Sequence, residues 1–133
     1  MTRLLHIAAA CLLDEQGRLL LVRKRGTHRF MLPGGKAEAG ETPLQTVRRE
    51  LAEELLLQLD ESALTLLGQF NEAAANEPDT RVQATVFRAA LRQPVSAAAE
   101  LEELRWLRAD EPRGEDLAPL LRKHVLPYLW PSE

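Results

Sequence analysis

Four glutamates lie close together in one stretch of the 133-residue chain: Glu41, and then Glu50, Glu53 and Glu54. If the last three lie on a helix, at about 100° per residue, Glu54 lies about 40° from Glu50, and Glu53 about 60° from it on the other side. Like charges in such a stripe destabilise a helix, and Arg49 relieves them only in part. Because hard divalent cations such as Mg²⁺ bind oxygen ligands, the stripe indicates a cation site; the alternative is a solvated helix face.

Two glycines precede this stretch, in the segment Leu32-Pro33-Gly34-Gly35-Lys36. Backbone without side chains can approach a ligand closely, so its carbonyls could join a metal shell and its N–H groups could face phosphate oxygens. Lys36 and the basic run 23–25 add positive charge near the same loop. Carboxylates, a glycine loop and basic residues together indicate phosphate chemistry.

The glutamates need a helix to hold them, and the sequence predicts one over residues 43–56. Thr42 is a good N-cap, Pro43 fits the first helical position and Gln45 completes a capping box. The apolar face of this helix consists of Leu44, Val47, Leu51 and Leu55.

The remaining patterns predict a strand hairpin over 4–24, strands at 64–70 and 81–92, a short strand around 105–107 and a C-terminal helix over 117–128. Residues 32–35 and 71–79 are predicted to be loops. Strands, helix, strands and helix in this order predict a mixed α/β sandwich, and the length predicts a single domain over residues 1–133.

Composition excludes several classes of protein. The chain carries 17 basic and 20 acidic residues, a net charge of −3, which disfavours stable binding to nucleic acid or anionic membranes. Its one cysteine, Cys11, cannot form an internal disulfide, which favours a reducing, cytoplasmic location. Residues 3–11 loosely imitate a signal segment, but a buried strand with a core cysteine fits them better.

The glycine loop and the glutamate helix resemble the Nudix box. The family pattern is Gly-x5-Glu-x7-Arg-Glu-U-x-Glu-Glu-x-Gly-U, where U is a bulky aliphatic residue, and it matches residues 35–57 from Gly35 through Glu41 to the run Arg49–Leu57. The one departure is Leu56, which stands where the family has a glycine that normally ends the helix. This departure concerns the C-cap of the helix more than the chemistry.

The resemblance implies an α/β/α sandwich with a mixed sheet and a hydrolase that uses Mg²⁺ or Mn²⁺. It implies metal ligation by the carbonyl of Gly34 and by the carboxylates of Glu50, Glu53 and Glu54. It further implies that Arg49 orients the glutamates and that Glu41 supports the loop or a metal-bound water. A box glutamate, here Glu53, is favoured as general base; the alternative is a glutamate of a later loop, Glu100, Glu102 or Glu103.

For the substrate, the resemblance implies a nucleotide. Residues expected to contact it are Arg23, Lys36 and Gly35, and the aromatic residues that could stack on a base are Phe30, Phe70, Phe87 and Trp106. Ala73, Ala74 and Ala75 occupy the positions of the family's ADP-ribose and diadenosine polyphosphate signatures. The expectation is therefore a small MutT-like hydrolase of nucleoside triphosphates or oxidised nucleotides, monomeric or homodimeric. The alternatives are an ADP-ribose or nucleotide-sugar pyrophosphatase and a non-catalytic nucleotide-binding module.

Overall fold

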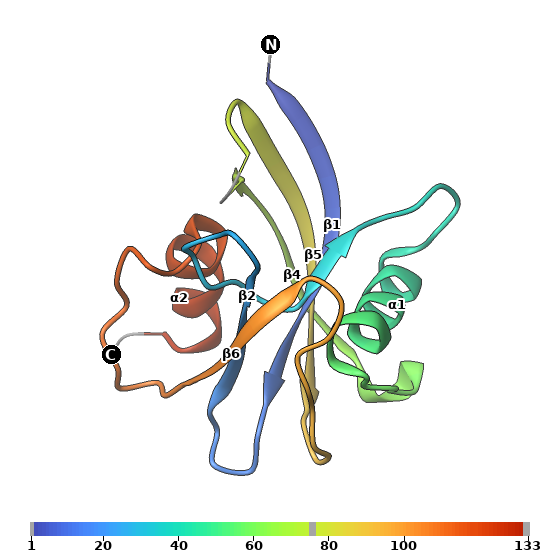
Figure 1. Cartoon of the computed structure of the whole chain (residues 1–133), viewed down its shortest axis with the longest axis vertical. Helices are drawn as coiled ribbons and strands as arrows, with labels where there is room; N and C mark the ends of the chain where they lie inside the picture. The colour runs from blue at the N-terminus through green and yellow to red at the C-terminus, as the bar shows by residue number, and fades with distance from the viewer. Residues whose placement is uncertain (1, 75–76, 132–133) are drawn as a thin grey trace.

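The computed structural model describes residues 2–74 and 77–131, and Figure 1 shows its arrangement. Six strands form one mixed sheet: β1 (Arg3–Leu13), β2 (Leu19–Lys24), β3 (Gly34–Lys36), β4 (Thr65–Ala73), β5 (Thr80–Ala90) and β6 (Leu101–Leu107). The helical segments are α1 (Pro43–Leu55), the 3₁₀ turn η1 (Glu61–Ala63), the π-helical turn η2 (Leu121–Val125) and α2 (Leu126–Leu129).

Strand β1 lies at the centre of the sheet, whose order is β4-β5-β1-β2-β6. It pairs with β5 in parallel along its whole length, from Arg3 with Thr80 to Leu13 with Ala90. Its other edge is shared, because β3 pairs antiparallel with residues 7–9 and β2 meets it at Leu13. The short β3 thereby places the two glycines against the middle of the sheet.

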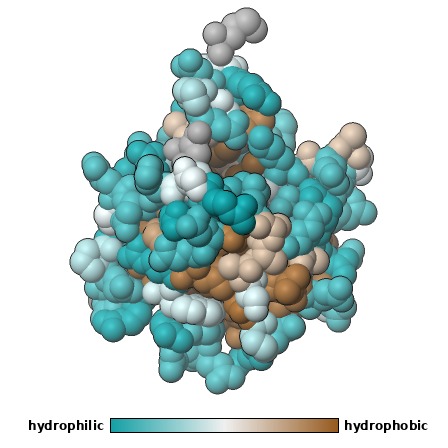
Figure 2. All heavy atoms as spheres, viewed as in Figure 1, coloured by the Kyte–Doolittle hydropathy of each residue, from teal (hydrophilic) through white to brown (hydrophobic). Residues whose placement is uncertain are grey.

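Alternation along β1 divides the interior into two cores. Ala8, Ala10 and Leu12 face the core under α1, whereas Ala9 and Cys11 face the core under η2 and α2. In Figure 1, α1 lies on one side of the sheet and α2 on the other. This arrangement confirms the predicted α/β/α sandwich with a mixed sheet. Hydrophilic residues cover much of the face drawn in Figure 2, and hydrophobic residues show in its middle.

Helix α1 begins where its sequence signals predict. The side chain of Thr42 accepts a hydrogen bond from the N–H of Gln45, and the Gln45 side chain accepts one from the N–H of Thr42, so both halves of the capping box form. The helix ends at Leu55, one residue before the predicted end, because Leu56 adopts a left-handed conformation with φ of 55°. Leu56 thus takes the C-cap conformation that glycine normally supplies.

Two predicted boundaries are wrong. The predicted loop 32–35 contains the start of β3, because Gly34 pairs with Ala9 of β1. The predicted C-terminal helix starts later than Leu117, because the backbone of Phe30 pairs with that residue and its carbonyl accepts the N–H of Ala118. The helical region beyond this point ends at Leu129 and contains a π-helical turn.

Two strands are longer than predicted. Pairing with β5 extends β4 through Ala73, so the first residues of the predicted loop 71–79 belong to a strand. Pairing with β2 extends β6 from Leu101 to Leu107. Residue 76 of the predicted loop 71–79 and the signature position Ala75 lie outside the described residues.

Cys11 lies on β1 and is fully buried, as the buried-strand interpretation predicts. Burial raises the pKa of its thiol to about 12, so the thiol stays protonated and unreactive. Over residues 2–74 and 77–131, no helix has the length and apolar character needed to cross a bilayer.

Candidate active site

Strand β3 and helix α1 bring the two glycines against two of the glutamates. The N–H of Gly34 donates a hydrogen bond to Oε1 of Glu54 over 3.1 Å, and Glu54 is only 2% exposed. A Cβ placed on Gly35 would lie 2.4 Å from Oε2 of Glu50, and one on Gly34 would lie 2.2 Å from the carbonyl oxygen of Ala8. A side chain at position 34 would therefore collide with the backbone of β1, and one at position 35 would displace the Glu50 carboxylate.

Burial makes both carboxylates costly to ionise. Desolvation raises the pKa of Glu54 to about 7, although the Gly34 N–H partly offsets it, and the nearby charge of Glu50 raises it further. Desolvation also raises the pKa of Glu50, against the hydrogen bond from Arg49. A cation beside these two groups would remove that cost.

Arg49 connects the helix with the loop before it. Its Nε donates to Oε2 of Glu41 over 2.7 Å and its Nη2 donates to Oε1 over 3.0 Å, a bidentate pair. Its Nη1 lies 3.0 Å from Oε2 of Glu50 and 3.4 Å from Oε1 of Glu53, and its Nη2 also donates to the carbonyl of Lys36. The hydrogen bonds from Arg49 hold the pKa of Glu41 down at about 2. Arg49 thus lies in a position that would suit the orienting role predicted for it.

The three helix glutamates do not converge on one point. Glu54 and Glu50 turn towards the glycines, whereas the Glu53 side chain is 54% exposed and contacts Arg49. Among the described residues, no group of three or more carboxylate, imidazole or thiolate side chains is arranged to hold a metal ion. The carboxylates of Glu50 and Glu54 still fit Mg²⁺, which commonly takes one or two carboxylates and completes its shell with water and substrate phosphate.

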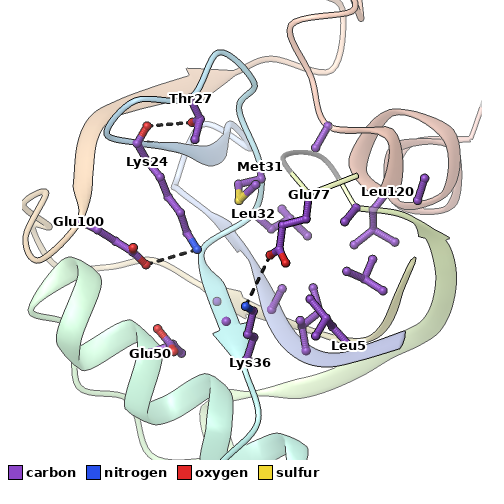
Figure 3. A pocket seen from close by; sticks show the side chains of 18 residues that line it. Leu5, Lys24, Thr27, Met31, Leu32, Lys36, Glu50, Glu77, Glu100 and Leu120 are labelled. Carbon is purple, nitrogen blue, oxygen red and sulfur yellow. Dashed lines mark hydrogen bonds and ion pairs between the residues drawn. The ribbon is translucent and has the colours of Figure 1, made fainter. Parts of the chain in front are cut away.

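A cavity of about 380 Å³ opens beside this group, and Figure 3 shows its lining. One end is polar and carries Gly34, Gly35, Glu50, Lys24 and Glu100. Leu5 and Leu120 lie at the opposite end in Figure 3, and the rest of the lining is largely apolar, with Ile7, Met31, Leu32 and Val82. Lys36 and Glu77 lie between the two ends and pair across 3.5 Å. The cavity therefore offers a charged compartment next to an apolar one.

Of the predicted substrate contacts, Gly35 and Lys36 line this cavity and Arg23 does not. The Arg23 guanidinium instead donates to Oε1 of Glu103 over 3.1 Å and to the carbonyl of Thr27 over 2.8 Å. Phe30, Phe70, Phe87 and Trp106 are also absent from the lining, so within the described residues no aromatic side chain faces the cavity.

The structure separates the three later glutamates that sequence analysis grouped together. Glu102 and Glu103 pair with Arg23, at 3.9 and 3.0 Å, away from the cavity. Glu100 lines the cavity and lies 3.3 Å from Nζ of Lys24. Of the three later glutamates, Glu100 is therefore the one that lines the same cavity as the glycines and Glu50.

Sequence reasoning did not single out Lys24 or Glu77. Lys24 was part of a basic run, but a register shift between Arg23 and Lys24 breaks the alternation that would tell which of them faces the cavity. Glu77 lies in the connection between β4 and β5, where no periodicity gives a direction. The only available signal for either residue was its charge.

Comparison with known proteins shows the family to which this fold belongs. The NUDIX domain family model matches residues 3–129. The 8-oxo-dGTP diphosphatase of Haemophilus influenzae is 37% identical over 57 residues, which cover 40% of this chain and 42% of that relative. This match thus spans less than half of the relative's length.

Two solved structures cover nearly the whole chain. A MutT NUDIX hydrolase from Burkholderia pseudomallei has a TM-score of 0.76 at 22% identity, covering 98% of this chain and 99% of the other. The ORF135 protein of Escherichia coli has a TM-score of 0.70 at 20% identity, covering 99% and 96%. At such identities the two structures show a common fold, and with the family match over residues 3–129 they place the chain in the NUDIX family.

Proposed function

We propose that this protein hydrolyses a phosphoanhydride bond of a nucleoside triphosphate, including oxidised nucleotides, with the help of Mg²⁺ or Mn²⁺. The observation that carries the proposal is the cavity itself, in which Glu50 and the backbone of Gly34 and Gly35 form one end and apolar side chains form the other. A nucleotide has the same division, with an anionic polyphosphate at one end and a largely apolar base at the other.

Glu50 and Glu54, with the Gly34 carbonyl, would hold the divalent cation, and Glu53 would join them only by turning away from Arg49. When bound, the cation would neutralise the polyphosphate and lower the pKa of the attacking water. Gly35 and Lys36 line the cavity where phosphate oxygens would lie. Arg49 keeps Glu50 in place, and Glu41 keeps Arg49 in place.

Hydrolysis needs a carboxylate that takes the proton of water as the water oxygen bonds to phosphorus and the anhydride P–O bond breaks. Two glutamates are the candidates for this role. Glu53 lies next to Glu54 on α1, and Glu100 lines the cavity. Glu53 keeps the base role that the box resemblance implies, and Glu100 is the alternative that the cavity favours.

The choice of a triphosphate over other nucleotides rests on likeness to relatives. The partial match is to a protein named for 8-oxo-dGTP hydrolysis, and Ala73 and Ala74 at the cavity do not match the signatures of the ADP-ribose and diadenosine enzymes. The cavity volume lies within the range of small-molecule sites. Products would be the nucleoside monophosphate and pyrophosphate.

The test is a hydrolysis screen with Mg²⁺ and with Mn²⁺ over nucleoside triphosphates, 8-oxo-dGTP, ADP-ribose, nucleotide sugars and dinucleoside polyphosphates. Glu54→Gln is the site variant, because its amide oxygen can still accept the Gly34 N–H while the charge is lost. Glu115→Gln, an exposed carboxylate between β6 and the C-terminal helical region, is the matched control.

We expect metal-dependent turnover of a triphosphate that falls at least about a hundredfold in Glu54→Gln and is unchanged in Glu115→Gln. Preferred turnover of ADP-ribose or a nucleotide sugar would replace the proposed substrate. Tight nucleotide binding without turnover of any substrate would instead favour the non-catalytic module.

A further inference from the structure

Lys24 places an ammonium group among the carboxylates of the cavity. It is the last residue of β2, its side chain is about one-third exposed, and its Nζ lies 3.3 Å from Oε1 of Glu100. Figure 3 shows the side chain extending towards Glu100, on the side of the cavity where Glu50 lies.

The charge of Lys24 reaches more than its nearest partner. It lowers the pKa of both Glu50 and Glu54, against the burial that raises it, and the charge of Glu100 acts on Glu54 in the opposite direction. Lys24 therefore lies in the field of three carboxylates that come from two elements distant in sequence, helix α1 and the segment before β6.

The other cations near this site already have carboxylate partners. Lys36 pairs with Glu77, and Arg49 divides its hydrogen bonds between Glu41 and Glu50. Of the described residues lining the cavity, Lys24 and Lys36 are the two that carry a positive charge, and only Lys24 pairs with a carboxylate on the Glu50 side. A mobile four-carbon stem allows this ammonium to change partners without backbone movement.

We propose that Lys24 is an exchangeable counter-ion: in the cation-free protein it pairs with Glu100 and partly compensates the charge of Glu50 and Glu54, and it is displaced onto the polyphosphate when a divalent cation enters. Only the transfer of Lys24 to the polyphosphate rests on the proposed function; its pairing with the carboxylates does not. Before exchange, the ammonium and a divalent cation compete for the same cluster of carboxylates, because two positive charges beside that cluster repel each other. After exchange the ammonium faces the oxygens of the nucleotide, which the same cavity would hold.

The exchange has a consequence that a purely structural ion pair would lack. Lys24 should weaken binding of a divalent cation to the free protein and strengthen binding of the nucleotide to the metal-loaded protein. Removing its charge should therefore move the two affinities in opposite directions.

The test compares Lys24→Met, which keeps the length and loses the charge, with Lys24→Arg, which keeps the charge. Arg25→Met is the matched control, because it loses the same charge one residue away, and the Arg25 guanidinium contacts the Ala99 carbonyl instead of lining the cavity. Mn²⁺ affinity is measured by calorimetry on the full chain without nucleotide. KM for the preferred triphosphate is then measured at saturating Mn²⁺.

We expect Lys24→Met to bind Mn²⁺ roughly tenfold more tightly and to raise KM roughly tenfold, with wild-type values in Lys24→Arg and Arg25→Met. Unchanged or weaker Mn²⁺ binding by Lys24→Met overturns the counter-ion role. Equally tighter Mn²⁺ binding by Arg25→Met also overturns it, because the effect would then come from the overall charge of the protein. An unchanged KM overturns the transfer to phosphate. If the wild type hydrolyses no nucleotide, the proposed function fails, while the Mn²⁺ comparison still decides the counter-ion role.

Discussion

Each side of the sheet holds a glutamate in a different electrostatic environment. Under α1, Glu54 is 2% exposed, receives one hydrogen bond from Gly34 and has a raised pKa. On β4, the carboxylate of Glu72 accepts the N–H of Ala73 and lies 3.1 Å from His124 and 3.7 Å from Lys123 of the C-terminal helical region, and its pKa is lowered. One carboxylate is held without a full counter-charge and the other is neutralised within the chain.

This difference separates a binding face from a supporting face. A buried carboxylate without a partner costs stability, which a ligand cation can restore. The pairing of Glu72 with His124 and Lys123 ties the C-terminal helical region to the sheet and leaves nothing for a ligand to neutralise. The two cores are otherwise similar, because each packs leucines and valines against alternate residues of β1.

The largest expected effect tests whether the two cores differ in function while being alike in stability. Leu51 of α1 and Leu126 of α2 are both fully buried, one in each core. Truncating either to alanine should lower the free energy of unfolding by about 2–5 kcal/mol, measured by urea unfolding. Only Leu51→Ala should also weaken Mn²⁺ binding several-fold, because it loosens the helix that carries Glu50 and Glu54. Equal Mn²⁺ affinities in the two variants would contradict the division into a binding face under α1 and a supporting face under α2.

The second prediction uses pH to compare the two glutamates directly. Because the pKa of Glu54 rises from 4.5 to about 7 on folding, its ionisation makes the metal-free protein less stable as pH increases from about 4.5 to 7. Above pH 7, Glu54→Gln should be more stable than the wild type by about 3 kcal/mol, and the difference should vanish below about pH 4.5.

Glu72→Gln provides the opposite sign. The lowered pKa of Glu72 means that its charge stabilises the fold above its ordinary pKa and that this contribution is lost in acid. This variant should therefore be less stable than the wild type at pH 8. Urea unfolding with a chelator at pH 4, 6 and 8 measures both variants. A destabilised Glu54→Gln at pH 8 would show that Glu54 is a structural group like Glu72.

A third prediction concerns the guanidinium that holds the binding face together. Arg49→Lys keeps the charge but loses the fork that contacts Glu41, Glu50 and the Lys36 carbonyl at once. We expect a loss of about 10- to 100-fold in turnover or Mn²⁺ affinity, as is typical of residues that orient metal ligands. The neighbouring Arg48→Lys, whose Nε donates to the Leu59 carbonyl outside the site, should retain both. Equal losses in the two variants would point to α1 stability as the cause.

Features that depend on neighbouring residues were predicted well from the sequence. The start of α1 was predicted correctly because the capping box of Thr42 and Gln45 is a local interaction, and the stripe of glutamates followed from helix geometry. Strand β3 was missed because two glycines are typical of a loop, and only their pairing with the distant Ala8 and Ala9 of β1 makes them a strand. The late start of the C-terminal helical region has the same origin, since Phe30 holds Leu117 in a bridge.

The site was predicted as a set of residues and not as an arrangement. The spacing of Glu50, Glu53 and Glu54 placed them on one stripe, but side-chain torsions turn Glu53 towards Arg49. Which of the later glutamates faces the cavity depends on Arg23 and Lys24, and a bulge between these residues decides it. Torsions and bulges respond to tertiary contacts, and a single sequence does not contain them in readable form.

The smallest expected effect concerns Leu56, where the chain departs from the family glycine. Leu56 has φ of 55° and is 68% exposed, so its side chain gains little from packing while its backbone is strained. A left-handed conformation costs a non-glycine residue about 1–2 kcal/mol, and replacement by glycine removes this cost. Part of the gain is lost, because glycine has more conformational entropy in the unfolded chain. Leu56→Gly should therefore raise the free energy of unfolding by about 1 kcal/mol.

Asp79→Gly is the matched control, because Asp79 also has a left-handed backbone, with φ of 51°. Aspartate adopts this conformation more readily than leucine, so the free energy of unfolding should rise less than in Leu56→Gly. Turnover should be unchanged in both variants, since Leu56 follows the last turn of α1 and lines no part of the cavity. A more stable Leu56→Gly with lower turnover would instead mean that the strained cap holds Glu53 and Glu54 in position. The stability that the α1 side of the sheet gives up for function would then include the strained backbone of Leu56 as well as the buried carboxylate of Glu54.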